Sequence, residues 1–438
     1  MHITRRDAMR FGLFSAAGLL ISERLPRRLW ADSARPAKAK SIIQIWMWGG
    51  PSHLDTFDPK PAAGYDYCGP LDKPIPTNVN GIVISEILPL LAKQADKYSI
   101  IRGMTHGINA HETASYAVQT GRRSGGHDVY PSVGAVVSLF KGYNAGYTGL
   151  IPPYIVLTQP LGRFSEEGFL GPSYQPFATG GDPAQAQFVV EGVVAQNITA
   201  ERQKDRRELL RQLNSIGAVP NAGASLDAFT QSEEKAYDLI LGESGKVFDL
   251  SIEKDDLRDR YGRNTFGQSC LVARRLVERG VAFVAINYNG WDTHKQNFQV
   301  MRQRLPQMDK GMAALIEDLH ERGLLDSTIL WWGGEFGRTP RVMWEAPWNG
   351  GRNHHGEAFC TVLAGGGFKG GHVVGSTDAK GEQVRDRPVS PAEVIASMYE
   401  LLGIGPEAKL PHPQGLDVPA VPPALEGTGP VGRLSEMM

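Results

Sequence analysis

Three apolar segments of this sequence end in glycine-containing turns that are followed by acidic or histidine side chains. The segments span residues 41–48, 281–287 and 327–332, and each is a near-continuous run of aliphatic and aromatic residues. A strand that is buried on both faces of a sheet has this composition, because neither of its faces meets water. We therefore predict three buried strands, each followed by a loop that carries polar side chains.

Other segments complete an alternation of strands and helices. Further strands are predicted at 98–102, 153–157 and 359–364, and helices at 86–97, 111–120, 265–279, 305–322 and 391–402. Helical spacing of apolar residues that stops at a glycine, as at Gly121 and Gly323, marks helix ends. Strands that alternate with helices predict an α/β fold with a mostly parallel central sheet and helices on both faces.

The domain organisation follows from where this alternation begins and ends. A chain of 438 residues can bury one large core, and we predict a single domain over residues 40–405. Residues 200–245 mix charged and aliphatic positions in two helical segments, which predicts a helical insertion. Residues 411–438 are rich in proline and are predicted to form an extended C-terminal tail.

The first 34 residues have the pattern of an export signal. Arg5 and Arg6 precede an apolar stretch, residues 11–21, that is too short to span a membrane as a helix. An arginine pair before such a stretch is typical of twin-arginine export, which predicts a periplasmic or secreted protein. An ordinary basic N-terminus is the alternative. After this signal, no apolar run is long enough for a transmembrane helix.

Composition narrows the class of protein further. A hydrophobic content of 41% is ordinary for a soluble globular chain. The formal net charge of −1 argues against nucleic acid as the partner. Three cysteines, Cys68, Cys270 and Cys360, are too few for a disulfide framework.

Side chains that could bind a divalent cation follow each of the three buried strands. The carboxyl ends of parallel strands form the edge of a sheet where ligands bind. His53 and Asp55 follow the first strand, and imidazole and carboxylate together suit Zn²⁺ or Mn²⁺. Asp58 follows them, but it could instead cap the turn at Pro59, with His53 a surface residue.

The loops after the second and third strands carry the stronger candidates. Asp292 and His294, two residues apart, could bind one ion from one loop, although Asp292 could also cap a helix. Glu335 could ligate a metal, and Arg338 could hold an anion through its planar guanidinium. A structural ion pair between Glu335 and Arg338 is the alternative.

Two further segments carry candidate site residues. Adjacent histidines on an extended backbone point in opposite directions, so we predict that His354 is a metal ligand and that His355, with Arg352 and Asn353, contacts the substrate. His111 opens a predicted helix, whose N-terminus favours an anion. A capping role for the segment around His111 fits equally well.

The chain resembles known families at these residues. The segment 111–122, which ends in Thr120-Gly121-Arg122, is similar to the nucleophile-bearing helix of the alkaline phosphatase and sulfatase superfamily. More closely, residues 40–405 resemble the bacterial family called domain of unknown function 1501. Its pattern is matched at 49–59, 266–276, 290–298, 333–340 and 363–371. The resemblance implies an alkaline phosphatase/sulfatase-like core and, by analogy, a divalent-metal hydrolase of phosphate or sulfate esters.

The sequence departs from these families at two positions. His111 stands where a sulfatase has its catalytic Cys or Ser, which excludes formylglycine chemistry there. His111 would then be a phosphoryl acceptor or a metal ligand, and Thr113 is the nearest hydroxyl. Asn353 replaces the family's more usual Asp, which removes one possible carboxylate ligand.

Two functional hypotheses follow. The first is an exported hydrolase of small-molecule or glycan sulfate or phosphate esters that uses a divalent metal, Zn, Mn or Ca. Its predicted metal ligands are His53, Asp55, Asp292, His294, Glu335 and His354, and its predicted catalytic residues are His111, Thr113 and Arg338. The second is a non-catalytic carbohydrate- or anion-binding protein on a hydrolase fold, in which tryptophans such as Trp344 and Trp348 stack on a sugar.

Overall fold

The computed structural model describes residues 36–159, 166–185, 188, 190, 245–424 and 431–438. Its centre is an eight-stranded sheet with the order β12-β4-β11-β8-β1-β7-β5-β6. Neighbouring strands are parallel except where β11 pairs with β4 and β8. The predicted α/β fold with a mostly parallel sheet is confirmed.

The longer strands agree with those predicted, and the two-residue edge strands are too short to leave a sequence pattern. The sheet consists of β1 (Ser41–Trp46), β4 (Tyr98–Met104), β5 (Tyr154–Leu157), β6 (Phe177–Ala178), β7 (Phe283–Asn287), β8 (Thr328–Gly333), β11 (Phe359–Ala364) and β12 (Val373–Val374). Separate small hairpins are formed by β2 (Ile75–Pro76) with β3 (Val83–Ile84), β9 (Gly337–Arg338) with β10 (His354–His355), β13 (Ser376–Thr377) with β14 (Val384–Asp386), and β15 (Lys409–Leu410) with β16 (Val418–Pro419).

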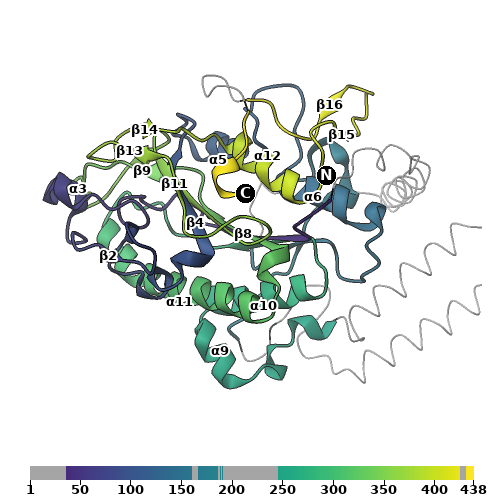
Figure 1. Ribbon diagram of the computed structural model, residues 1–438, viewed down its shortest axis with the longest axis horizontal. Helices are drawn as coiled ribbons and strands as arrows, with labels where there is room; N and C mark the ends of the chain where they lie inside the picture. The colour runs from purple at the N-terminus through teal and green to yellow at the C-terminus, as the bar shows by residue number, and fades with distance from the viewer. Residues whose placement is uncertain (1–35, 160–165, 186–187, 189, 191–244, 425–430) are drawn as a thin grey trace, which may run out of the picture.

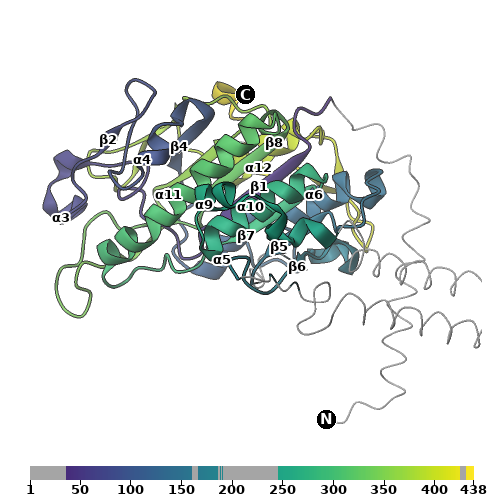
Figure 2. The same ribbon diagram turned by 90° about the horizontal axis from the view of Figure 1, so that it is seen from below.

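Helices cover both faces of the sheet, as Figure 1 shows. One face is covered by α4 (Pro89–Ala92), α9 (Asp255–Tyr261), α10 (Thr265–Glu278) and α11 (Asn297–Glu321), and Figure 2 looks onto this layer. The other face is covered by α5 (His111–Thr120), α6 (Val133–Lys141) and α12 (Pro391–Leu401). A short helix, α3 (Tyr65–Cys68), lies in the loop after β1.

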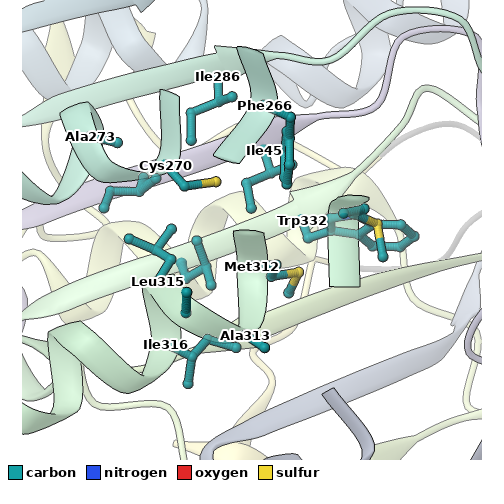
Figure 3. Packing of buried hydrophobic residues seen from close by; sticks show 14 of the residues in the cluster. Ile45, Phe266, Cys270, Ala273, Ile286, Met312, Ala313, Leu315, Ile316 and Trp332 are labelled. Atoms are coloured by element: carbon teal, nitrogen blue, oxygen red, sulfur yellow. The ribbon is translucent and has the colours of Figure 1, made fainter. Parts of the chain in front are cut away.

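The core consists of two apolar layers, one on each side of the sheet. Successive strand side chains point to opposite faces, so Ile43 and Ile45 of β1 join the α10–α11 layer, while Ile42 and Trp46 join the other. Figure 3 shows the first layer, where helical side chains such as Phe266 meet Ile45 and Trp332 of the sheet. Burial of apolar side chains on both faces of the sheet stabilises the strands and so fixes the positions of their ends.

The three glycine-terminated strands of the sequence are the three central neighbours of the sheet. β1 lies between β7 and β8, with Trp46 opposite Asn287 on one side and Gly333 on the other. A Cβ atom on Gly49 would collide with the backbone nitrogen of Asp292, so the loops after β1 and β7 touch only because this residue is glycine. The polar side chains that follow the three strands therefore meet at one edge.

The helix predicted at 86–97 is wrong as a single element. The structure has the short helix α4 and then a 3-10 turn at Ala95–Lys97. Pro89 occupies the first turn of α4, where a missing N–H costs nothing. The chain must then turn into β4 at Tyr98, which leaves no length for a continuous helix.

Two predicted segments lie largely or wholly outside the described residues: the signal at 1–34 and the helical insertion near 200–245. The described end of the tail lies against α12, since Leu434 and Met437 are buried and Leu434 N donates to Ser397 Oγ at 2.9 Å. None of the helices in the described ranges has the length and apolar character needed to cross a membrane.

A buried ionic network joins the helices of the α9–α11 layer. The Arg274 guanidinium lies 3.0 Å from Asp318 and 2.7 Å from Glu253, and its third partner is Glu278 at 2.6 Å. Tyr261 of α9 donates to Asp318 Oδ2 at 2.9 Å. The side chains of Arg274 and Asp318 are only 2% and 3% exposed, so each compensates part of the other's buried charge. Arg322, with Nε 2.7 Å from Asp318 Oδ1, is a further partner of Asp318.

Replacing Asp318 by Ala is expected to lower the free energy of unfolding by about 3 kcal/mol, because it removes the buried partner of Arg274 and of the Tyr261 hydroxyl. Urea unfolding followed by circular dichroism measures this change. Glu278→Ala is the matched control: its side chain is 40% exposed, and its loss should cost less than about 1 kcal/mol. Equal losses in the two variants would contradict the network.

Candidate metal centre

Three histidines surround the carboxylate of Asp292 at the carboxyl edge of the sheet. The Nε2 atoms of His294 and His354 are 2.9 Å apart. They lie 3.0 Å and 3.1 Å from Oδ1 of Asp292. His111, the first residue of α5, places Nε2 at 3.4 Å from the other carboxylate oxygen, Oδ2. The structure thus brings together residues from α5, the loop after β7, and β10.

Each of these imidazoles is held through its other nitrogen. Nδ1 of His111 lies 2.6 Å from Glu335 Oε1, Nδ1 of His294 lies 2.9 Å from Asn353 Oδ1, and Nδ1 of His354 lies 2.7 Å from the backbone oxygen of Asn109. All three partner atoms are acceptors, so each Nδ1 donates. In neutral His294 and His354 this leaves a lone pair on Nε2, directed at Asp292 Oδ1.

This arrangement fits a bound cation. The Nε2 atoms of His294 and His354 and the Asp292 oxygen would repel one another at such distances without positive charge between them. Donor atoms bound about 2.0–2.1 Å from one ion lie about 2.9–3.4 Å from each other at ordinary coordination angles, and the observed separations are 2.9–3.1 Å. Among the described residues, His111, Asp292 and His354 also bring their ligand atoms within 4.8 Å of one another.

The guanidinium of Arg338 contacts Asp292 from the interior of the protein and orients its carboxylate. It is fully buried, and its Nη2 lies 2.5 Å from Asp292 Oδ1. Burial alone would raise the pKa of Asp292, but hydrogen bonds from His111 and Arg338 outweigh burial and hold this pKa well below its usual range. Asp292 is therefore ionised at neutral pH. Because Arg338 faces inward, the structure does not place it where a substrate would meet it.

Glu335 contacts His111 and lies outside the group of ligand atoms. Its carboxylate is fully buried, and Oε1 also accepts from the backbone nitrogen of Gly49 at 2.9 Å. Burial raises the pKa of Glu335, against the effect of the hydrogen bond from His111. Hydrogen bonding to Asp292 and then to Glu335 raises the pKa of His111 to about 9. The His111 ring stacks on Trp48, with centroids 5.5 Å apart.

Asp55 and Arg352 form a separate buried ion pair. Arg352 Nη2 lies 3.0 Å from Asp55 Oδ1, and Arg352 Nε lies 3.0 Å from Oδ2. Asn297 Nδ2 donates to the same Oδ2 at 2.7 Å. Both carboxylate oxygens are thus engaged by protein donors. The structure brings neither Asp55, predicted as a metal ligand, nor Arg352, predicted to contact substrate, into the histidine cluster.

His53 and His355 form another pair away from the cluster. Their ring centroids are 6.1 Å apart, His53 Nε2 lies 2.8 Å from the oxygen of Gly381, and His355 Nε2 lies 2.8 Å from the oxygen of Glu382. Burial lowers the pKa of His53 to about 4. The alternation of side chains along β10 thus sends His354 to the cluster and His355 to the opposite side.

The remaining predicted residues have local roles. The Thr113 hydroxyl donates to the oxygen of Ala110 at 3.3 Å and lines a pocket of about 270 Å³ beside Tyr116, not the cluster. Asn353 holds the His294 ring instead of standing free for a substrate. Sequence reasoning missed Asn109, which acts on His354 through its backbone oxygen. A backbone acceptor leaves no signal in the residue type.

Comparisons with known proteins bear on the fold and the family. The family model described as "Protein of unknown function (DUF1501)" matches residues 39–424. The lipoteichoic acid synthase LtaP from Listeria monocytogenes is 10% identical with a TM-score of 0.39, over 90% of this chain and 77% of that chain. The PsFucS1 sulfatase from Pseudoalteromonas sp. is 14% identical with a TM-score of 0.35, over 91% and 73%. The C-terminal periplasmic domain of EcEptC from Escherichia coli is 10% identical with a TM-score of 0.36, over 88% and 89%.

One curated relative is matched over a short segment. The cysteine–tRNA ligase 1 of Photobacterium profundum is 29% identical over 126 residues, which cover 28% of this chain and 26% of that protein. This match spans about a quarter of the relative's length. The solved structures have TM-scores below 0.5, so neither comparison carries a function over to this chain. The family match covers the whole predicted domain, confirms the resemblance seen in the sequence, and shows that the chain belongs to the DUF1501 family.

Proposed function

We propose that this chain is a metal-dependent hydrolase of phosphate or sulfate esters, with one divalent cation bound by Asp292, His294 and His354. The observation that carries the proposal is the convergence on Asp292 of imidazoles whose Nδ1 atoms are all anchored. Catalytic metal sites use three protein ligands and keep a further position for water or substrate. The side chains of Asp292 and His294 are 43% and 35% exposed, so a ligand can reach this position.

The donor atoms indicate which cation fits. Two imidazole nitrogens and one carboxylate suit Zn²⁺ or Mn²⁺, whereas Ca²⁺ takes oxygen ligands. Of the three metals predicted from the sequence, we therefore favour Zn²⁺ and Mn²⁺. When bound, such a cation supplies Lewis-acid stabilisation of charge on an ester oxygen.

The first turn of α5 provides a place for the anionic part of the ester. This helix has ten residues and begins at His111 beside the cluster, and its N-cap residue Ala110 supplies no side-chain hydrogen bond. The first N–H groups of a helix and its dipole favour a bound anion. A phosphate or sulfate held between these N–H groups and the cation would meet His111 at its edge.

We further propose that the protein is exported and that its substrate is a small ester. Arg5, Arg6 and the short apolar stretch after them support export by the twin-arginine route to the periplasm or the medium. The substrate would be a small-molecule or glycan ester, since the near-neutral chain offers little attraction to nucleic acid.

His354→Ala is expected to weaken Zn²⁺ or Mn²⁺ binding by more than about 100-fold, because losing a ligand costs more than losing a residue that merely orients one. Titration calorimetry with the purified protein measures the affinity. His355→Ala is the matched control, since this neighbouring side chain contacts Glu382 and His53 instead. Metal binding that survives His354→Ala, or that falls equally in the control, would show that the ion binds elsewhere.

The metal-loaded protein is expected to hydrolyse 4-nitrophenyl phosphate or 4-nitrophenyl sulfate. Activity should disappear with a chelator, return with Zn²⁺ or Mn²⁺, and fall by more than about 100-fold in kcat/KM in His294→Ala, which removes a ligand. Release of 4-nitrophenolate measures the rate. Asp309→Asn, which changes a buried side chain of α11 that contacts Leu90 and Leu91 and not the cluster, serves as a control.

A non-catalytic sugar-binding role would be recognised in the same experiments. Tyr65 is 62% exposed and stacks on Trp344, which stacks in turn on Phe298, with centroids 4.8 Å and 5.6 Å apart. An exposed aromatic face of this kind can hold a sugar ring. Bound metal without turnover, together with glycan binding that is lost in Tyr65→Ala, would support this second function over the first.

A further inference from the structure

A pocket of about 460 Å³ lies between α4, α9 and α11, apart from the metal centre. Both α4 and α9 pack against α11 in the helical layer of Figure 2. The side chains of α11 that line the pocket recur every three or four residues from Lys310 to Glu321, so they share one face of the helix. This helix begins at Asn297, close to the loop of His294. At about 1.5 Å per residue the pocket starts about 20 Å further along α11.

Two exposed lysines of this pocket have no ion-pair partner within the described residues. Lys93 ends α4 and Lys310 lies on α11, and neither ammonium group forms a salt bridge or a hydrogen bond there. Lys93 acts electrostatically on Asp309, the neighbour of Lys310, so the two lysines lie at the same end of the pocket. The Asp309 carboxylate already accepts two backbone N–H groups. A third lysine, Lys97, is paired with Asp96 at 3.2 Å.

The opposite end of the pocket carries carboxylates. Arg260 Nη1 lies 3.6 Å from Glu317 Oε2, and its Nη2 lies 3.1 Å from Glu321 Oε2. Glu317 follows Lys310 by about two turns, or roughly 10 Å of α11. A second negative charge on a ligand would be repelled at this end, whereas hydroxyl groups could donate to the remaining lone pairs of the two carboxylates. The pocket is therefore suited to a ligand with its negative charge at the lysine end and hydroxyl groups along the rest.

A buried amide at the wall of the pocket lacks a hydrogen-bond donor. Gln94 is only 9% exposed, its Nε2 donates to the backbone oxygen of Ala313 at 3.1 Å, and its Oε1 has no partner in the described part of the chain. Both residues line the pocket, so the amide lies at its wall. An unpaired buried acceptor is unfavourable. A carboxylate or sulfate brings only acceptors, so a ligand that pairs with Gln94 must also carry a donor.

Apolar groups line the pocket between its two charged ends. Ala313 and Ala314 are buried and small, and Leu90 is 39% exposed. Such a surface can contact the C–H groups of a sugar ring. The volume is larger than an inorganic anion needs and lies within the range of small-molecule sites.

We propose that this pocket is a second binding site, which takes an acidic sugar. Its carboxylate, sulfate or phosphate would lie between Lys93 and Lys310, because ammonium groups attract these anions without selecting their geometry. Its hydroxyl groups would donate to Gln94 Oε1 and to the carboxylates of Glu317 and Glu321. The inference does not rest on the proposed function, since no bond is made or broken here and none of these residues belongs to the metal centre.

Titration calorimetry of the full chain with galacturonate, galactose and acetate tests the proposal. Galacturonate is expected to bind at least about 10-fold more tightly than either of the others, because galactose lacks the charge and acetate lacks the hydroxyl groups. Galactose 6-sulfate should bind like galacturonate, and added salt should weaken both. Acetate that binds as tightly as galacturonate would reveal a simple anion site and overturn the proposal, as would the absence of binding by both charged sugars.

The double variant Lys93→Gln, Lys310→Gln places the binding. It should weaken galacturonate binding by more than about 10-fold and leave the circular dichroism spectrum unchanged, since both side chains are exposed. The matched control is Lys380→Gln, Lys409→Gln, which removes two exposed lysines outside the pocket and the same net charge. This control should bind galacturonate like the wild type.

Two results would overturn the assignment to this pocket. Equal weakening in the two double variants would mean that the net charge of the chain, and not the pocket, attracts the sugar. Binding that persists without Lys93 and Lys310 but disappears in His354→Ala would place the sugar at the metal centre.

Discussion

The candidate site depends on one buried cation, the guanidinium of Arg338. It donates to the backbone oxygens of Gly49 and Gly50 after β1 and of Arg352 before β10, and it binds Asp292 after β7. Arginine alone among side chains offers five donors in a fixed plane. A buried charge is tolerated only when its donors are satisfied, so these loops must converge on Arg338 for the chain to fold. The convergence that stabilises Arg338 also assembles the cluster around Asp292.

The same ion pair sets the charge that a ligand meets. Arg338 offsets the charge of Asp292, and His111 is similarly paired with Glu335. The imidazoles of His294 and His354 add ligand atoms without charge when they are neutral. A divalent cation at this position would therefore keep most of its positive charge, which favours phosphate or sulfate, and the dipole of α5 acts in the same direction. The preference for an anionic ester thus follows from how the site's own charges are paired.

The sequence predicted the strands and part of the cluster for a physical reason. Buried parallel strands leave a continuous apolar pattern, and residues just after them reach one shared edge, so Asp292 and His294, which follow β7, could be predicted to lie there. His354 was predicted from the pair of adjacent histidines on an extended backbone. The sequence of a loop does not show in which direction its side chains point. Asp55 looked equivalent to Asp292, but its partner Arg352 is 297 residues away in the sequence. Likewise, no local pattern reveals that backbone oxygens surround Arg338 and turn it from the substrate toward the interior.

The connection between β8 and β11 explains why the site forms where the alternation of strands and helices stops. A parallel neighbour would require a crossover that carries the chain back to the opposite edge of the sheet. Because β11 is antiparallel to β8, the intervening residues stay at the carboxyl edge throughout. They form only the small β9–β10 hairpin, and they supply Glu335, Arg338 and His354 in turn. One reversal of strand direction therefore gives a single connection enough length at that edge to provide a ligand, the residue that orients Asp292, and the carboxylate that holds His111.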